Sequence, residues 1–173
     1  MSTHPMTTHP MTTHPIATAP PPDYRRNVGA ALFNHQGKVL VARRAGLPRT
    51  ASHAWQMPQG GIDRGEAPEQ AVLRELGEEI GTSHAEIIGL HPHWLCYDLP
   101  GPRRGRYRGQ AQIWFALRFL GTDTDIRLDA TAHIEFDQWR WADLAELPAL
   151  VVPFKRPVYE VVARAFAGFA DPA

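Results

Sequence analysis

The chain has 173 residues with 18 Lys+Arg and 18 Asp+Glu, so its formal net charge at pH 7 is zero. This balance excludes a protein that is held to nucleic acid or to a membrane by bulk basic charge. The length fits one domain, and no apolar run approaches the roughly 18 residues of a membrane span. The single cysteine, Cys96, excludes an intramolecular disulfide. We therefore expect a cytoplasmic protein without a secretory signal or a membrane partner.

Residues 1–22 differ in composition from the rest of the chain. They carry no charged side chain, repeat Thr-His-Pro and hold six of the 16 prolines. Such a stretch buries too little apolar surface to offset the entropy of ordering it. We expect a disordered low-complexity tail over 1–22 and one folded domain over 23–173. The role of the repeat and the true start, at Met1, Met6 or Met11, stay open.

The remaining chain divides into β-prone runs and two helical segments. Strands are expected at 28–33 and 38–43, joined by a hairpin at 34–37, and then at 85–99, 110–120 and 136–141, with a short apolar-polar piece at 55–58. One helix is expected over Pro68–Ile80, with Gly81 at a left-handed C-cap, and another over 158–169. Mixed strands with two well-separated helices predict an α+β sandwich.

Three carboxylates share one face of the first helix. At about 100° per residue, Glu75, Glu78 and Glu79 fall within an arc of about 100°. The apolar side chains that can face the core lie to one side of this arc, at Leu73, Leu76 and Ile80. Such a face is suited to a hard divalent cation, which prefers oxygen ligands. A solvated acidic surface remains the alternative, because exposed like-charge pairs cost only about 0.2–0.5 kcal/mol each.

A glycine pair, Gly60-Gly61, lies upstream of this helix, and its backbone can pass close to the carboxylates. Glycine pair and helix together resemble the Nudix box, whose fixed positions are here Gly60, Glu66, Arg74, Glu75, Leu76, Glu78, Glu79 and Gly81. The sequence departs from the box at Thr82, where a bulky apolar residue is usual.

The resemblance implies a Nudix fold, an α/β/α sandwich with a mixed β-sheet. It also implies hydrolysis of a nucleoside diphosphate linked to another group, with Mg²⁺ or Mn²⁺ as the cofactor. Glu75 and Glu79 would bind the metal, helped by the carbonyl of Gly60, and Glu135 would complete the site from a distant segment. An ordinary surface acid is the alternative for Glu135.

The same resemblance assigns catalytic roles. Glu78 would be either a further metal ligand or the base that deprotonates the attacking water. Arg74 would hold a catalytic carboxylate in position, and Glu66 would brace the junction between loop and helix.

The flanking segments resemble those of the bacterial RNA pyrophosphohydrolase group, over about residues 24–166. The matching segments are YRRNVG (24–29), WQMPQGGI (55–62), WLCYDLP (94–100), GQAQ (109–112), EF (135–136) and FKR (154–156). The resemblance implies removal of pyrophosphate from 5′-triphosphorylated RNA. A dinucleoside polyphosphate hydrolase is the alternative enzyme, and a non-catalytic Nudix-fold binding module is a third possibility.

The resemblance also implies a substrate pocket. Its residues are Arg44 on a phosphate, Gln110 on a water or phosphate, and Tyr97, Val152, Phe154 and Lys155 around a 5′-terminal base. The alternatives are a solvated strand end for Arg44, a strand-end hydrogen bond for Gln110 and core packing for Phe154. Ala111 and Ile113 replace two lysines of the group.

Charge is segregated locally despite the overall balance. Residues 63–86 carry a net charge of −5 and residues 103–108 a net charge of +4. The four arginines of 103–108 are the best candidates for contacts to an RNA backbone, with a merely solvated loop as the alternative. His91 and His93 are expected on one face of a strand, where a zinc site has little support because no further ligand cluster accompanies them. The resemblance leaves the oligomeric state open, and we expect a monomer.

Overall fold

Eight strands pair into one mixed β-sheet. The computed structural model describes residues 19–103 and 105–172, so most of the expected tail lies outside the described residues. The strands are β1 (Tyr24–Phe33), β2 (Val39–Arg44), β3 (Trp55–Gln56), β4 (Gln59–Gly61), β5 (Ala85–Leu90), β6 (Leu95–Asp98), β7 (Gly109–Phe119) and β8 (Phe136–Ala142). The order β3-β2-β1-β7-β5 forms the main path, while β4 pairs with β1, β6 with β7 and β8 with β2. Only β1 and β7 pair in parallel.

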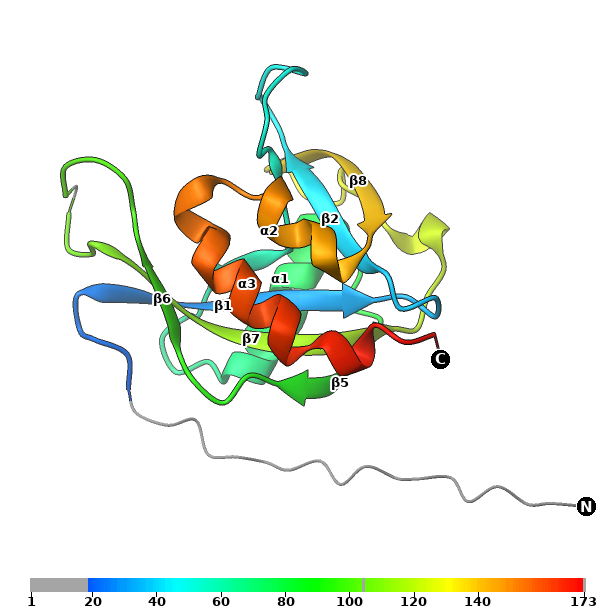
Figure 1. Ribbon diagram of the computed structural model, residues 1–173, viewed down its shortest axis with the longest axis horizontal. Coiled ribbons are helices and arrows are strands. Elements are labelled where there is room, and N and C mark those ends of the chain that lie inside the picture. The colour runs from blue at the N-terminus through cyan, green and yellow to red at the C-terminus, as the bar shows by residue number, and fades with distance from the viewer. Residues whose placement is uncertain (1–18, 104, 173) are drawn as a thin grey trace, which may run out of the picture.

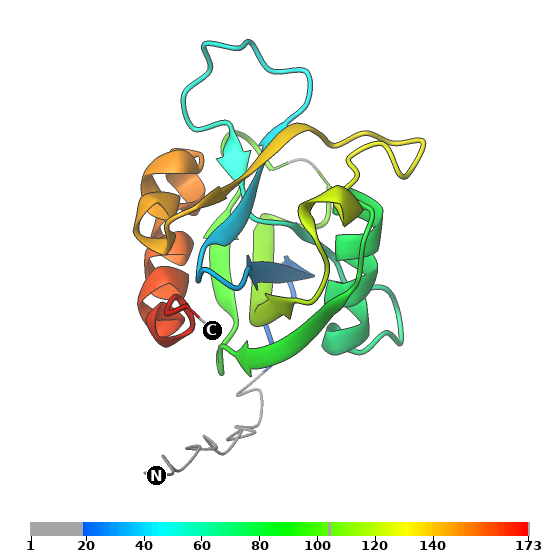
Figure 2. The same ribbon diagram turned by 90° about the vertical axis from the view of Figure 1, so that its right-hand side faces the viewer.

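Helices cover both faces of the sheet. Helix α1 (Pro68–Ile80) lies on one face, and α2 (Leu147–Leu150) and α3 (Arg156–Ala165) lie on the other (Figures 1 and 2). Short 3-10 turns occupy Asp123–Asp125, Leu144–Glu146, Pro153–Lys155 and Ala167–Phe169. The α+β class and the α/β/α sandwich with a mixed sheet are thereby confirmed. Within the described ranges, no helix has the length and apolarity needed to cross a membrane.

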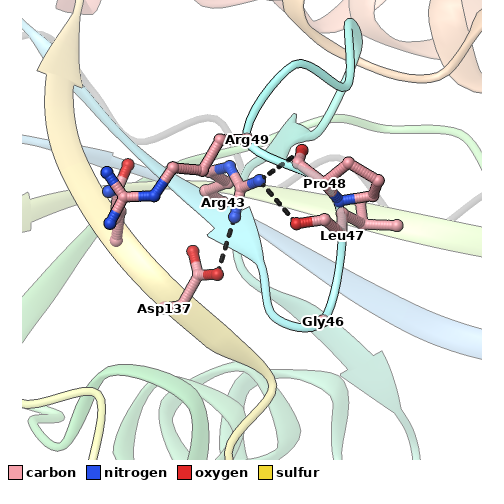
Figure 3. Close-up of a pocket in the computed structure, with 7 residues that line it drawn as sticks. Arg43, Gly46, Leu47, Pro48, Arg49 and Asp137 are labelled. Atoms are coloured by element: carbon pink, nitrogen blue, oxygen red, sulfur yellow. Dashed lines mark hydrogen bonds and ion pairs between the residues drawn. The ribbon is translucent and has the colours of Figure 1, made fainter.

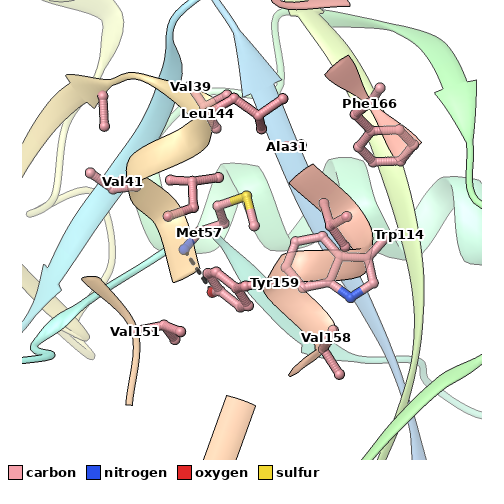
Figure 4. Close-up of a cluster of buried hydrophobic side chains, with 14 of the residues drawn as sticks. Ala31, Val39, Val41, Met57, Trp114, Leu144, Val151, Val158, Tyr159 and Phe166 are labelled. Carbon is pink, nitrogen blue, oxygen red and sulfur yellow. Dashed lines mark hydrogen bonds between the residues drawn. The ribbon is translucent and has the colours of Figure 1, made fainter. Parts of the chain in front are cut away.

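Two apolar cores lie on opposite sides of the sheet, because successive side chains of a strand point to opposite faces. Trp114 of β7 packs with Tyr159 of α3, at 5.5 Å between ring centroids, in the core that also buries Met57 (Figure 4). The Tyr159 hydroxyl accepts the backbone N–H of Met57 at 3.0 Å. Ile113 faces the other core, where α1 buries Leu76 and Ile80.

The elements with strong local signals form as expected. Helix α1 has the expected bounds, and Gly81 caps it with φ of 75°. The hairpin at 34–37 is closed by Asn34, whose side-chain oxygen accepts the N–H groups of Gln36 and Lys38 at 3.0 Å. The bounds of these segments are set by local residues and do not depend on residues distant in the sequence.

Three expected elements are wrong in extent, and one strand was not expected. The strand expected at 28–33 begins four residues earlier, at Tyr24. The strand at 85–99 is interrupted between β5 and β6, where Pro92 has no N–H to donate to a sheet. His91 and His93 therefore lie in this break, with the His91 ring bonded to the His93 carbonyl at 3.0 Å, and do not alternate along a strand. The helix expected at 158–169 starts at Arg156 and ends at Ala165, while Gln59–Gly61 pair as β4.

Two glycines of α1 provide a test of this local order. A Cβ at Gly77 meets no atom within 4 Å, so Gly77→Ala should raise the free energy of unfolding by about 0.5–1 kcal/mol. A Cβ at Gly81 would lie 2.6 Å from the Arg127 carbonyl oxygen at a left-handed φ, so Gly81→Ala should lower it by more than about 1 kcal/mol. Urea unfolding of both variants measures the two effects. Equal midpoints would contradict the assigned helix end.

Candidate active site

Strand β4 passes directly over the acidic face of α1. A Cβ at Gly60 would collide with the carboxylate of Glu75, so any side chain at residue 60 would displace this carboxylate. The backbone N–H of the neighbouring Gln59 donates to Glu79 Oε2 at 2.9 Å. Glu79 is 5% exposed, Glu75 is half-buried, and the Glu78 side chain is 54% exposed. The face is therefore part of a site rather than a uniformly solvated surface.

Glu135, the residue that precedes β8, lies near this face. Burial, followed by the charge of Glu135, raises the pKa of Glu79 well above its usual range. Burial also raises the pKa of Glu75, with smaller contributions from Glu78 and Glu135. Glu75, Glu79 and Glu135 thus crowd together beside the Gly60 backbone. Carboxylate oxygens are the ligands that a hard divalent cation prefers, and a cation bound here would relieve the repulsion.

The Arg74 guanidinium makes hydrogen bonds to both the loop and the helix. It donates to both carboxylate oxygens of Glu66 at 2.8 and 2.9 Å, to Glu75 at 2.8 Å, to Glu78 at 3.3 Å and to the Gly61 carbonyl at 2.8 Å. Its hydrogen bonds lower the pKa of Glu66 to about 2. As the side chains stand, Arg74 holds Glu75 and Glu78, and the described residues contain no cluster of three His, Cys, Asp or Glu ready to hold an ion.

A buried cationic and aromatic cluster lies near the carboxylates. Lys155 is 4% exposed, donates to Gln56 Oε1 at 3.2 Å and lies 5.5 Å from the Tyr97 ring centroid. Burial, followed by the charge of Arg44, lowers the pKa of Lys155 to about 8, while Glu79 and Glu135 oppose this shift. Lys155 therefore lies between Arg44 and the acidic face.

The aromatic part of this cluster is formed by the buried Tyr97 and by Phe154, whose ring centroids are 5.7 Å apart. Phe154 and Val152 are half-buried and also pack against the core, so core packing is one of their roles. The Tyr97 hydroxyl donates to Gln110 Oε1, and burial raises the pKa of Tyr97 to about 12. Gln110 thus makes a hydrogen bond to Tyr97 near the start of β7.

The arginine-rich loop does not present four equivalent cations. Arg108 pairs with Asp98 at 2.5 Å and lies 5.5 Å from the Tyr24 ring centroid, so it anchors the loop to β1. Arg103 donates to carbonyl groups of its own loop, and Arg104 lies outside the described residues. A cavity of about 590 Å³ opens beside this loop, lined by Asp98, Leu99, Pro100, Gly101, Pro102, Arg103, Tyr107, Arg108 and Phe154.

Sequence reasoning missed several buried polar residues near the site. Arg43 is buried and donates to Asp137 at 2.6 Å and to the carbonyl groups of Leu47 and Pro48 at 2.8 and 2.7 Å, beside a cavity of about 560 Å³ (Figure 3). These bonds hold the loop that follows Arg44. The sequence signal that could have identified Arg43 is a charged residue near the end of an otherwise apolar strand. Gln56, Gln59 and Gln112 carried no such signal.

The structure thus brings together a partly buried carboxylate face, a glycine backbone that covers it, and a nearby lysine and arginine. The family described as the NUDIX domain matches residues 23–162. The chain therefore belongs to the Nudix family.

Known relatives and solved structures agree with this assignment. The chain is 62% identical over 151 residues to an RNA pyrophosphohydrolase of Acidiphilium cryptum, covering 85% of this chain and 92% of the relative. It is 57% identical over 154 residues to an RNA pyrophosphohydrolase of Rhodospirillum rubrum, covering 86% and 90%. The crystal structure of a MutT protein from Methanosarcina mazei superimposes with a TM-score of 0.60 at 22% identity, covering 85% and 98%. That likeness shows the fold alone.

The buried Glu79 carboxylate should destabilise the metal-free protein. The pKa of Glu79 is raised in the folded protein, so the folded state binds its proton more tightly than the unfolded state does. The free energy of unfolding therefore falls as the pH rises from the ordinary glutamate pKa of about 4.3 to the folded pKa. Above the folded pKa, the free energy of unfolding stays at this lower level. Glu79→Gln keeps an acceptor for the Gln59 N–H and has no charge to bury. We expect a higher urea midpoint at pH 7 in EDTA and no such gain below about pH 4.

Glu69→Gln, on the exposed first turn of α1, is the matched control and should leave the midpoint nearly unchanged. Equal midpoints for wild type and Glu79→Gln at pH 7 would contradict the assigned burial of this charge.

Proposed function

We propose that this chain is an RNA pyrophosphohydrolase, which removes pyrophosphate from the 5′-triphosphate end of RNA in the cytoplasm, leaves a 5′-monophosphate and so promotes RNA decay. The names of relatives at 62% and 57% identity support this activity. The observation that carries it is the position of Lys155 and Tyr97 beside the acidic face. This arrangement lets one nucleotide present its phosphates to the carboxylates and its base to the aromatic side chains.

The metal ligands we assign are Glu75, Glu79, Glu135 and the Gly60 carbonyl. Bound Mg²⁺ or Mn²⁺ supplies neutralisation of phosphate charge and a lowered pKa for coordinated water. The chain contributes a rigid β4 backbone on one side and a buried carboxylate on the other. Arg74 keeps the loop and the helix in register through Glu66 and Gly61.

Glu78 is the base that we assign, with a further metal ligand as its alternative role. Its side chain is the most exposed of the three helix carboxylates, so water reaches it. Arg74 Nη1 lies 3.3 Å from its Oε2 and orients the carboxylate. Glu78 takes the proton of the attacking water while pyrophosphate departs.

The substrate is held by charge and stacking. Lys155 and Arg44 bind phosphate oxygens, and Tyr97 and Phe154 contact the 5′-terminal base, with Val152 at the edge. Stacking on aromatic side chains suits an unpaired RNA end and is worth about 1–3 kcal/mol per base. Gln110 supports the Tyr97 hydroxyl in this cluster.

A dinucleoside polyphosphate hydrolase is the second candidate. The cavity of about 590 Å³ that Phe154 shares with Tyr107 has room for a second nucleoside beyond the first base. Both substrates present a nucleoside 5′-polyphosphate to the same carboxylates.

Substitution of the assigned base tests catalysis. Glu78→Gln should lower kcat for pyrophosphate release from 5′-triphosphorylated RNA by about 10²–10⁴-fold, because the amide cannot accept the proton. RNA binding should be largely retained, as a filter-binding assay would show. Glu69→Gln on the same helix is the control and should keep full activity. Full activity in Glu78→Gln would refute its role as the base.

Substrate choice separates the two candidate activities. At equal Mg²⁺, we expect kcat/KM to be higher for 5′-triphosphorylated RNA than for diadenosine tetraphosphate, with pyrophosphate as the product from RNA. A strong preference for the dinucleotide, or release of orthophosphate alone from RNA, would overturn the RNA assignment.

A further inference from the structure

Gln112 is a fully buried polar residue to which the mechanism above gives no task. It lies on β7, two residues before Trp114 and therefore on the same face of the sheet. It is 0% exposed, yet every side-chain hydrogen bond it makes is to another side chain. Such a network is costly if it is incomplete, and here the described residues leave no buried side-chain N or O without a partner.

The orientation of the Gln112 amide is dictated by Trp114. The indole Nε1–H is only a donor, and it donates to Gln112 Oε1 at 3.1 Å. The amide nitrogen must then point the other way. It donates to Asn27 Oδ1 on β1 at 2.9 Å and to Gln59 Oε1 on β4 at 3.1 Å.

These two acceptors belong to the pair of strands that forms the backbone side of the metal site. Strand β4 is three residues long and pairs with β1 through Asn27↔Gly61, Val28↔Gly60 and Gly29↔Gln59. Gln59 supplies the N–H that fixes Glu79, and a Cβ at the next residue, Gly60, would collide with the Glu75 carboxylate. Gln112 therefore ties the side chains of both strands to the rigid core.

We propose that Gln112 is a positioning residue for the metal site: its amide, oriented by the Trp114 indole, holds Gln59 and thereby sets where β4 presents the Gln59 N–H to Glu79 and the Gly60 backbone to Glu75. The expected effect of Gln112 on cation binding rests on the proposed metal-dependent activity. The hydrogen bonds of Gln112 do not depend on that activity. Loss of the amide should loosen β4 locally and weaken the binding of a divalent cation.

The experiment compares Gln112→Met, which keeps the length of the side chain and removes all three hydrogen bonds, with Leu117→Ala. Leu117 is equally buried on β7 but belongs to the opposite core, so this control reports general loss of stability. In the metal-free proteins, we expect hydrogen–deuterium exchange to accelerate at residues 59–61 in Gln112→Met and not in Leu117→Ala. Calorimetric titration with Mg²⁺ should show about tenfold weaker binding in Gln112→Met alone.

Activity adds a second readout. The loss of activity in Gln112→Met should be largely recovered at saturating Mg²⁺, which a damaged fold would not allow. If Gln112→Met does not fold, Gln59→Ala removes the bond between β4 and Gln112, together with the hydrogen bond between Gln59 and Tyr97, and should give the same local exchange and weaker Mg²⁺ binding.

Wild-type exchange at residues 59–61 in a folded Gln112→Met, or equal acceleration in Leu117→Ala, would overturn the proposal. Unchanged Mg²⁺ affinity together with faster exchange would also overturn it, because β4 would move without consequence for the metal. Failure of the wild type to bind Mg²⁺ would instead refute the assigned metal site, and the exchange data would still decide whether Gln112 positions β4.

Discussion

The burial of Glu79 beneath β4 is the constraint on which the site depends. A carboxylate that is removed from water is costly unless it is hydrogen-bonded and its charge is compensated. The Gln59 N–H satisfies one oxygen, but Glu75 and Glu135 bring further negative charge rather than relief. The metal-free protein thus holds a destabilising cluster of acids, and the remaining elements of the site are arranged to keep that cluster together.

Three different parts of the fold restrain this cluster. Helix α1 fixes the spacing of Glu75 and Glu79, and its buried face anchors it to the sheet through Leu76 and Ile80. Strand β4 closes the site from above because Gly60 has no side chain to collide with Glu75. Arg74 bridges loop and helix, and its hydrogen bonds restrain Glu66, Glu75 and Glu78 in the metal-free protein.

The predictability of each element follows from where its partners lie in the sequence. Helix α1 was predicted to the residue because Pro68, the apolar period and Gly81 are local signals. The sequence analysis predicted one strand across His91, although Pro92 is a local signal for a strand break, because β-prone runs flank it on both sides. The position of Glu135 came only from family resemblance, since 56 residues separate it from Glu79. Gln112 and Arg43 act through partners 53–94 residues away, and no local pattern pairs an amide or guanidinium with such partners.

The zero net charge of the chain is the result of opposed local charges that serve different purposes. The excess of acids over residues 63–86 is concentrated at the helix face, where geometry keeps it available for a cation. The excess of arginines over 103–108 is partly consumed, because Arg108 is neutralised by Asp98 and anchors the loop to β1. Long-range attraction of an RNA backbone by this loop is therefore weaker than the sequence count of four arginines implies. Lys155, buried between Arg44 and the acids, acts at short range, where a single cation is screened least by solvent. In the proposed function, recognition of the 5′ phosphates accordingly depends on this buried lysine more than on the charge of the exposed loop.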